Sequence, residues 1–388
     1  MSYFPMMKSL FLLLASSLAI SLLHAAPPSK QSSQVIAYVF PQSGILQPGQ
    51  IDARAVTRIN YAFANIQDGL MVLGHSNDSA NLAVLAGLRK ENPSLTILIS
   101  VGGWLWSGQF SDVALTQQSR TKFIQSVVEF INLYRLDGLD IDWEYPGMTG
   151  AGHPFRSEDR ENFTKLLKEL RAQFNREKSG TGRKLLLTIA AGAGDDYLAH
   201  TEMAEAQKYL DTVNLMAYDY YEPSSGQITG HHAPLFTNPM DPQKVSADAS
   251  VSAFKKAGVP ARKLVLGVPF YGHMWGEVPD SNHGLYQSGK PIPNAFAPFS
   301  LIESSMLNQG FTRYWDSTSS VPFLYSPEKH VFVSYEDEES LAAKCKYVVA
   351  HKLGGIMFWS YFNDSDGKLL KTIDSKLLER NSQSAIQK

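Results

Sequence analysis

Asp137-Gly-Leu-Asp-Ile-Asp-Trp-Glu-Tyr-Pro146 is the stretch that decides the fold, because acidic and large apolar residues alternate strictly along it. Side chains on a β-strand alternate between its faces, so Asp140, Asp142 and Glu144 should project to one side, about 6–7 Å apart along the chain. The apolar residues between them take the opposite face. A solvated acidic loop would not show this alternation, so the stretch predicts a buried strand.

Three carboxyls on one face of a buried strand cannot all ionise cheaply, because like charges raise at least one pKa. A protonated carboxyl beside an ionised one is the arrangement that breaks a glycosidic acetal. Glu144 is the outermost of the three and can reach a bridging oxygen, which favours it as the proton donor.

Short apolar runs alternate with longer amphipathic stretches, the pattern of βα units in a parallel sheet. Helices are predicted around Thr121–Leu133 and Arg160–Phe174. Eight such units predict an α/β fold, a (β/α)8 TIM barrel with its site at the C-terminal strand ends. An open doubly wound sheet is the alternative. The predicted strands are Val35–Phe40, Ile59–Ala64, Thr96–Gly102, Gly138–Glu144, Leu185–Ala191, Val213–Tyr218, Leu264–Pro269 and Gly355–Trp359.

Length and charge agree with one large barrel and exclude some partners. The chain has 388 residues, enough for a barrel with insertions, although two average domains would also fit. Its formal charge is −2, which gives no electrostatic reason to bind nucleic acid or an anionic membrane. Cys345 is the only cysteine, so a large core and not a disulfide must stabilise the fold.

The first residues carry the pattern of an export signal. Lys8 precedes the apolar run Leu10–Leu23, and Ala25 and Ala26 follow it. This predicts a signal peptide over residues 1–26, cleaved after one of the two alanines, with an uncleaved anchor as the alternative. We therefore expect a secreted or periplasmic protein that is a monomer and leaves the membrane after cleavage.

One interval breaks the βα rhythm. About 85 residues separate the seventh and eighth predicted strands, where a βα unit needs about 30. We interpret residues 272–333 as a small α+β insertion between strands 7 and 8, with the barrel formed by residues 32–271 and 334–378. Residues 379–388 are expected to form a polar tail.

The acidic stretch resembles the signature of glycoside hydrolase family 18, the chitinases, which is Asp-x-x-Asp-x-Asp-x-Glu. Asp137 and the three acids after it fill all four acidic positions. Three further segments match the family in the same order, Ser100-Val-Gly-Gly-Trp104, Met216-Ala-Tyr-Asp219 and Gly354-Gly-Ile-Met-Phe-Trp359. The resemblance covers most of the mature chain and implies the bacterial deep-cleft branch, which carries an α+β insertion before the last strand.

The resemblance also implies roles for the acids. In this family the substrate's own acetamido oxygen attacks the anomeric carbon. Asp142 would orient that group and stabilise the oxazolinium ring, and Tyr218 would hold it from across the site. Asp140 would tune the pKa of Asp142 through a shared proton. Retention of configuration follows, with no cofactor.

Other residues are expected to bind the substrate, chitin or N-acetylglucosamine oligomers. Core packing is an equally good interpretation for Tyr38 and Phe63. Where many family members carry arginine, this chain has His273, which offers fewer donors and titrates. The expected contacts are Trp104, Met216, Asp219, Tyr271, Trp359, Tyr38 and Phe63.

No metal is expected. His231 and His232 are adjacent, but no other His, Cys or acidic residue stands at ligand spacing in the sequence. Two other functions remain open. An endo-β-N-acetylglucosaminidase shares the acidic strand, and a non-catalytic chitin-binding lectin shares the scaffold but loses the glutamate at position 144.

Overall fold

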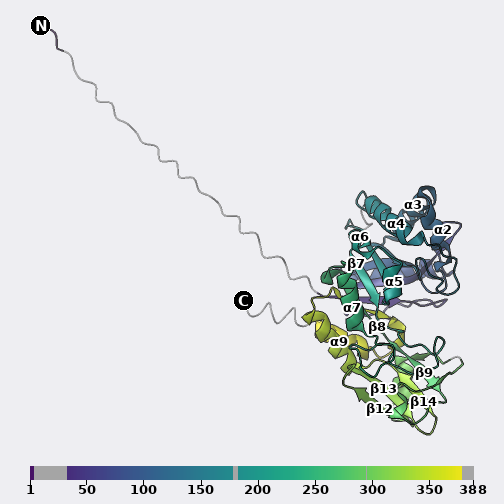
Figure 1. Ribbon diagram of the computed structural model, residues 1–388. Coiled ribbons are helices and arrows are strands. Elements are labelled where there is room, and N and C mark those ends of the chain that lie inside the picture. The colour runs from purple at the N-terminus through teal and green to yellow at the C-terminus, as the bar shows by residue number, and fades with distance from the viewer. Residues whose placement is uncertain (4–32, 178–181, 294, 378–388) are drawn as a thin grey trace. The chain divides into compact units, whose positions relative to one another are not determined.

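Eight parallel strands close into a barrel (Figure 1). The computed structural model describes residues 1–3, 33–177, 182–293 and 295–377, so the predicted signal peptide beyond Tyr3 and the polar tail lie outside the described residues. In the ring, β1 pairs with both β15 and β2, and each other strand pairs with its neighbours. The barrel strands are β1 (Gln34–Val39), β2 (Arg58–Gln67), β4 (Thr96–Gly102), β5 (Gly138–Asp142), β6 (Leu186–Gly192), β7 (Thr212–Met216), β8 (Leu264–Pro269) and β15 (Gly355–Trp359).

All eight predicted strands are present, and the predicted TIM barrel is confirmed. The closing pair of β1 and β2 excludes the open sheet. One strand was not predicted: β3 (Leu70–Leu73) pairs antiparallel with the extended end of β2 through the turn at Asp68 and Gly69. Both turn residues have positive φ angles, 51° and 74°, which suits a tight hairpin.

Helices surround the barrel and supply its outer core. The side chains of β5 that face outward, Leu139 and Ile141, are fully buried in a cluster that includes Phe123 of α3 and Phe163 of α4. Helix α3 begins at a capping box in which Thr116 and Ser119 satisfy each other's backbone N–H groups. The helices are α1 (Asp78–Gly87), α2 (Phe110–Leu115), α3 (Gln117–Tyr134), α4 (Asp159–Phe174), α5 (Asp195–Ala199), α6 (Met203–Ala206), α7 (Ala247–Lys256), α9 (Glu338–Ala350) and α10 (Lys368–Leu377).

Between β8 and α9 the chain forms a second, antiparallel sheet (Figure 1) and one short helix, α8. The order of its strands is β10-β9-β14-β13-β12, and β11 pairs with β9. Trp275, Tyr325 and Phe332 are fully buried in a cluster separate from the barrel core. The limits of this insertion as a domain remain a prediction. Its elements are β9 (Tyr271–Gly276), β10 (Lys290–Pro291), β11 (Ala297–Pro298), α8 (Phe299–Ser305), β12 (Thr312–Asp316), β13 (Val321–Ser326) and β14 (Val331–Ser334).

Two predicted strands end two residues earlier than expected. β5 ends at Asp142 and not at Glu144, and β7 ends at Met216 and not at Tyr218. At the end of β5 the carbonyl of Asp142 accepts hydrogen bonds from a loop, Gly103 N at 2.8 Å and Ser107 Oγ at 3.0 Å. The strand ladder stops where these loop donors replace a neighbouring strand.

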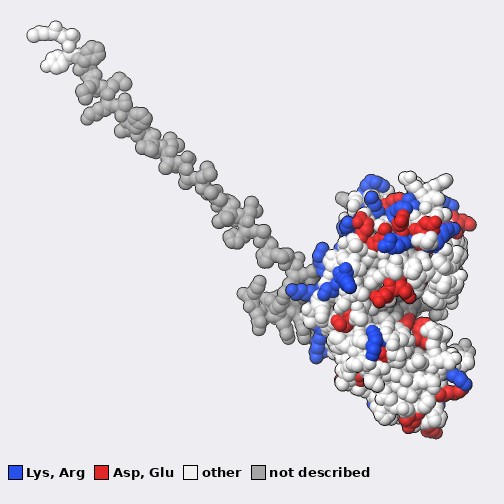
Figure 2. Space-filling model, viewed as in Figure 1, with Lys and Arg blue, Asp and Glu red and all other residues white. Residues whose placement is uncertain are grey.

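The surface carries charges of both signs. On the face in Figure 2, Lys, Arg, Asp and Glu intermix over the region of α2, α3 and α4. Among the residues that the structure describes, no helix is both long enough and apolar enough to cross a bilayer.

A fully buried ion pair joins α9 to the segment before it. Lys344 Nζ contacts the carboxylate of Glu336, and both side chains are fully buried. The same ammonium donates to the carbonyl of Ala233 at 2.7 Å, and Ser340 Oγ donates to Glu336 at 2.6 Å. Each charge is therefore compensated, and removal of one side chain leaves the other charge buried without an opposite charge.

Lys344→Met should lower the free energy of unfolding by about 3–5 kcal/mol, because the Glu336 carboxylate then stays buried without its cation. The double variant Lys344→Met/Glu336→Leu should recover most of that loss. Guanidinium unfolding measures both. Equal losses in the single and double variants would contradict the prediction.

Candidate active site

Asp140 sits in the barrel interior and accepts four hydrogen bonds. Tyr38 Oη and Ser100 Oγ donate to its Oδ2 at 2.8 and 2.9 Å. Thr188 Oγ1 and Asn214 Nδ2 donate to its Oδ1, the latter at 3.0 Å. The parallel register places Ser100, Asp140 and Thr188 side by side on β4, β5 and β6. A polar layer thus replaces the apolar filling usual in such barrels.

These donors decide how Asp140 can act. A carboxylate offers about four acceptor positions, and all are filled. Among the described residues Asp142 Oδ1 has no hydrogen-bond partner, and the proton expected to be shared between Asp140 and Asp142 stays a prediction. Burial raises the pKa of Asp140, while the hydrogen bonds oppose that rise. The charge of Asp140 is one contribution to the raised pKa of Asp142, after burial and the charge of Glu144.

Asp142 and Glu144 are both buried acids that hold protons more tightly than usual. The pKa of Asp142 is raised well above its ordinary value, first by burial, then by the charges of Glu144 and Asp140. Burial raises the pKa of Glu144 to about 7, against a hydrogen bond from Tyr145 that lowers it. A carboxyl with a pKa near neutrality can both give and take a proton at physiological pH.

The loop after β4 fixes the backbone around these acids. Gly102 has a φ of 103°, and a Cβ there would lie 2.3 Å from the carbonyl oxygen of Asp142. Only glycine permits that approach. Ser107 Oγ, which donates to the same carbonyl, accepts from the N–H of Glu144 at 3.0 Å. The Ser-x-Gly-Gly segment and the loop that follows it therefore position both carboxyls, although Glu144 lies beyond the strand on which it was predicted.

Aromatic side chains gather beside the acids at the barrel's C-terminal end. Trp359 is partly buried, and its ring stacks on Phe63 at a centroid distance of 5.4 Å and an interplanar angle of 23°. Tyr38 and Phe40 also contact it, at 5.8 and 5.4 Å. Trp104 is half exposed and meets the edge of Tyr145. A sugar could therefore stack on either tryptophan.

Met216 is the last residue of β7, so Tyr218 lies beyond the strand on which it was predicted. Both are nevertheless partly buried against the same apolar cluster as Trp359. Burial raises the pKa of the Tyr218 phenol, and the charges of Asp219 and Asp142 raise it further. Tyr218 therefore stays protonated and lies within electrostatic reach of the catalytic candidates.

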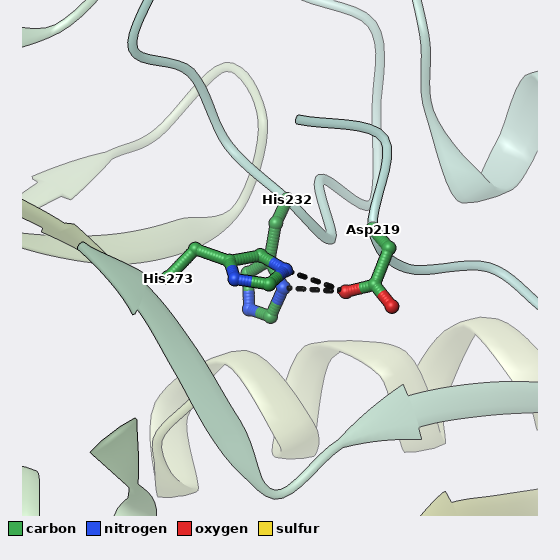
Figure 3. Close-up of side chains that lie close together, drawn as sticks. All are labelled: Asp219, His232 and His273. Carbon is green, nitrogen blue, oxygen red and sulfur yellow. Dashed lines mark hydrogen bonds and ion pairs between the residues drawn. The ribbon is translucent and has the colours of Figure 1, made fainter. Parts of the chain in front are cut away.

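Asp219 is the centre of a second polar cluster (Figure 3). Its backbone is left-handed, with a φ of 59°. His273 Nε2 donates to its Oδ1 at 2.8 Å, and the ring of His232 lies 3.5 Å from the same oxygen. Tyr271 Oη lies 2.7 Å from both carboxylate oxygens. No pattern in the sequence indicated this cluster, because its members come from three separate segments.

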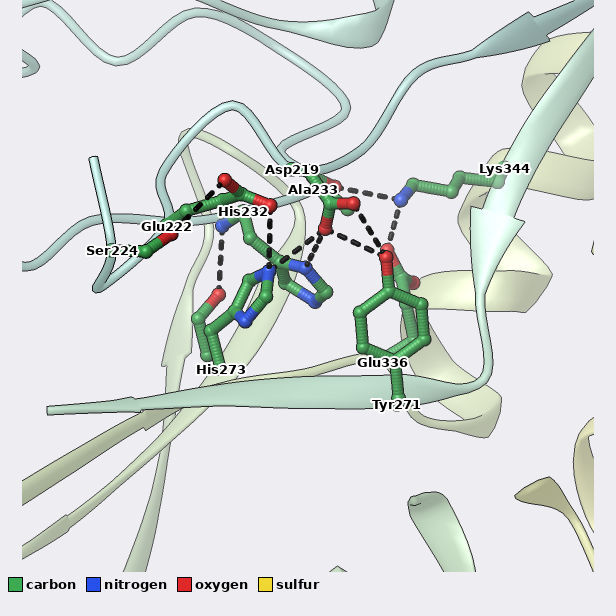
Figure 4. Close-up of polar contacts among 10 residues, drawn as sticks. Asp219, Glu222, Ser224, His232, Ala233, Tyr271, His273, Glu336 and Lys344 are labelled. Carbon is green, nitrogen blue, oxygen red and sulfur yellow. Dashed lines mark hydrogen bonds and ion pairs between the residues drawn. The ribbon is translucent and has the colours of Figure 1, made fainter. Parts of the chain in front are cut away.

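The pKa values of two members of this cluster are shifted. Burial would raise the pKa of Asp219, but hydrogen bonds from His232 and His273 lower it far below its ordinary value. Burial lowers the pKa of His232 to about 4, so its ring is neutral at neutral pH. Figure 4 shows Glu222 beside His273, with Lys344 and Glu336 beyond Tyr271.

The structure separates Asp137 from the other acids. It lies at the opposite end of β5, where Arg89 Nη2 is 2.6 Å from its Oδ2 and the N–H of Ile97 donates to the same oxygen. Asn214 and Thr188 were missed, although both are polar residues at inward positions of buried strands, which is a signal that the sequence contains.

Comparison with known proteins identifies the family. The pattern described as Glycosyl hydrolases family 18 matches residues 34–364. The chain belongs to this family. It is 36% identical to Chitinase A1 of Niallia circulans over 84% of this chain and 55% of that protein, so it spans about half the length of that relative. Chitinase B of Serratia marcescens is 32% identical, over 86% and 78% of the two chains.

A solved structure agrees with the family assignment. A family 18 N-acetylglucosaminidase from Paenibacillus barengoltzii has a TM-score of 0.81 and 40% identity, covering 89% of this chain and 100% of that one. The predicted family, glycoside hydrolase family 18, is confirmed.

Glu144→Gln should stabilise the fold at alkaline pH. The native pKa of Glu144 is about 7 against an ordinary 4.5, so the native state binds the proton more tightly than the unfolded chain. Stability present below pH 4.5 is therefore lost as the pH rises to about 7. Glutamine does not titrate, so its advantage over glutamate should grow by roughly 3 kcal/mol between about pH 4 and pH 8.

Urea unfolding of both chains at the two pH values measures this difference. Glu161→Gln, on the exposed side of α4, is the matched control and should show no such growth. If the Glu144→Gln variant had the same advantage over the wild type at both pH values, the prediction would be contradicted.

Proposed function

We propose that this protein is a chitinase that hydrolyses β-1,4 bonds between N-acetylglucosamine units, with retention of configuration. One observation carries the proposal: Glu144, a buried carboxyl with a pKa of about 7, lies just beyond Asp142 at the C-terminal end of β5. Active sites of TIM barrels lie at this end. Family membership and the chitinases among its relatives support the choice of substrate.

In the first step Glu144 donates its proton to the bridging oxygen as the glycosidic bond breaks. The acetamido oxygen of the sugar attacks the anomeric carbon and forms an oxazolinium ring, which leaves Glu144 ionised. Asp142 would accept the acetamido N–H and stabilise the positive ring. Its own raised pKa means that the two carboxyls share the available proton at neutral pH.

In the second step water attacks the anomeric carbon from the side that the leaving group left. The Glu144 carboxylate takes a proton from that water, and the oxazolinium opens to restore the acetamido group. Two inversions at one carbon give net retention. No metal or organic cofactor enters either step.

The aromatic residues would hold the sugar. Trp359 supplies a flat ring beside the acids, and Tyr218, protonated, can donate to the acetamido oxygen. Asp219 can accept from sugar hydroxyls, and the half-exposed Trp104 suits a sugar further along the polymer. Residues 1–26 support export, and we propose that the mature protein acts outside the cytoplasm as a monomer.

The name of one relative suggests a second candidate activity. The Paenibacillus protein is named an N-acetylglucosaminidase, so removal of single sugars from chain ends is a second candidate activity. A lectin role is not favoured, because Glu144 is present. Product lengths from a labelled chitin hexamer separate attack within the chain from attack at its ends, and a high-mannose glycoprotein tests an endo-β-N-acetylglucosaminidase.

Glu144→Gln should lower kcat on chitin oligomers by about 10²–10⁴-fold, because a general acid contributes that much. The wild-type kcat should fall as the pH rises through about 7, since Glu144 then loses the proton it must donate. Steady-state rates against pH measure both effects, and calorimetry should show that the variant still binds the oligomer. Turnover near the wild-type level in the variant would remove Glu144 from the acid role.

Replacing the acetamido groups of the substrate by hydroxyls should eliminate cleavage, because the internal nucleophile is then missing. A cellulose hexamer compared with a chitin hexamer under the same conditions makes the test. If both were cut at similar rates, a protein nucleophile would have to replace the sugar's own amide.

A further inference from the structure

Two histidines and one carboxylate converge outside the Asp140–Glu144 stretch, at the cluster of Asp219, His232 and His273 (Figure 3). One ligand atom from each residue lies within 4.8 Å of the other two. The carboxylate oxygen is 2.8 Å from His273 Nε2 and 3.5 Å from His232 Nδ1. Ligand atoms about 2.0–2.1 Å from one ion lie roughly 3–3.5 Å apart in tetrahedral or octahedral sites, so these spacings suit a shared ion.

The cluster is held in place by its surroundings. His273 lies on β9 opposite Ser334 of β14, and the hydroxyl of the same serine accepts from the N–H of His232 at 2.9 Å. Tyr271 holds the carboxylate of Asp219 from the other side. A hydrogen bond to a ligand carboxylate, such as that from Tyr271, orients it before an ion arrives. The backbone at both histidines is thus fixed through Ser334 of β14.

The local charge also favours a cation. Asp219 supplies one negative charge, and Glu222 Oε1 lies 4.0 Å from His273 Nε2, within reach of a fourth coordination position. The ammonium of Lys344, which opposes a positive charge on His232, is already paired with Glu336. The side chain of Asp219 is about one-third exposed, which leaves an approach for an ion from solvent.

We propose that Asp219, His232 and His273 bind one divalent transition-metal ion, of the class of Zn²⁺, Co²⁺ or Ni²⁺. Two imidazoles and one carboxylate suit these ions better than Mg²⁺ or Ca²⁺. Resting on the proposed function, the ion also competes with the sugar, because it takes the Asp219 oxygens that would accept sugar hydroxyls. The alternative is a hydrogen-bonded array of the three side chains that binds no ion.

The first experiment measures binding without activity. Untagged full-length protein, stripped with a chelator, is titrated with Zn²⁺ in a calorimeter and with Co²⁺ while its visible spectrum is recorded. One ion per chain and a Co²⁺ spectrum of nitrogen ligation are expected. Absence of binding, or a Co²⁺ spectrum of the hydrated ion alone, would overturn the site.

Three variants assign the ligands. His273→Arg keeps a donor for Asp219 but cannot ligate, so it should weaken Zn²⁺ binding by more than about 100-fold, since loss of an outer partner alone costs about 10–100-fold. His232→Gln should do the same. His351→Gln, at the exposed end of α9, is the matched control and should bind normally. Unchanged affinity in both ligand variants would place the ion elsewhere, and thermal unfolding checks that each variant is folded.

The competition is tested in the Glu144→Gln chain, which would not consume its ligand. A chitin tetramer at saturation should weaken Zn²⁺ binding at least tenfold. Unchanged Zn²⁺ affinity would overturn the competition and leave the ion site standing. Failure of the proposed function is seen separately, as absence of hydrolysis by the metal-free wild-type enzyme.

Discussion

Burial of the Asp140 carboxylate is the constraint on which the rest of the site depends. An ionised carboxyl in a barrel interior is tolerable only when protein donors replace its water. Here strands β1, β4, β6 and β7 each supply one donor, so four strands must keep their register for one side chain to be satisfied. The pKa of Asp142 is raised first by its own burial and by the charge of Glu144, and the buried charge of Asp140 adds to that rise.

At the end of β5, contacts to the backbone, and not the strand pairing itself, fix the positions of Asp142 and Glu144. The carbonyl of Asp142 meets Gly102 so closely that a side chain there would collide with it. Ser107 then bridges Asp142 and Glu144 with a single hydroxyl. Glu144 is therefore fixed although it lies beyond the strand, and this explains how Asp142 and Glu144 keep different environments.

Much of the fold was predictable because parallel barrel strands are buried on both faces and stand out as short apolar runs. The acidic strand was predictable for a related reason, since Asp140 and Asp142 break such a run at inward positions. Strand ends were less predictable: Ser107, in the loop that terminates β5, is 35 residues from Asp142 in the chain. The cluster around Asp219 could not be predicted, because spacing along the sequence does not reveal that residues 219, 232 and 273 meet. The hairpin strand β3 was missed because it lies outside the βα pattern.

The position of β9 has a consequence for how such enzymes diverge. This strand opens the antiparallel sheet, yet Tyr271 and His273 on it are the immediate neighbours of Asp219. The inserted sheet therefore contributes two side chains to the polar cluster around Asp219. A chimera that exchanged the segment between β8 and β15 for that of a relative would replace Tyr271 and His273, two of the side chains that contact Asp219, and would keep His232. Evolution can therefore retune that carboxylate by altering a peripheral module while every acid on β5 stays unchanged.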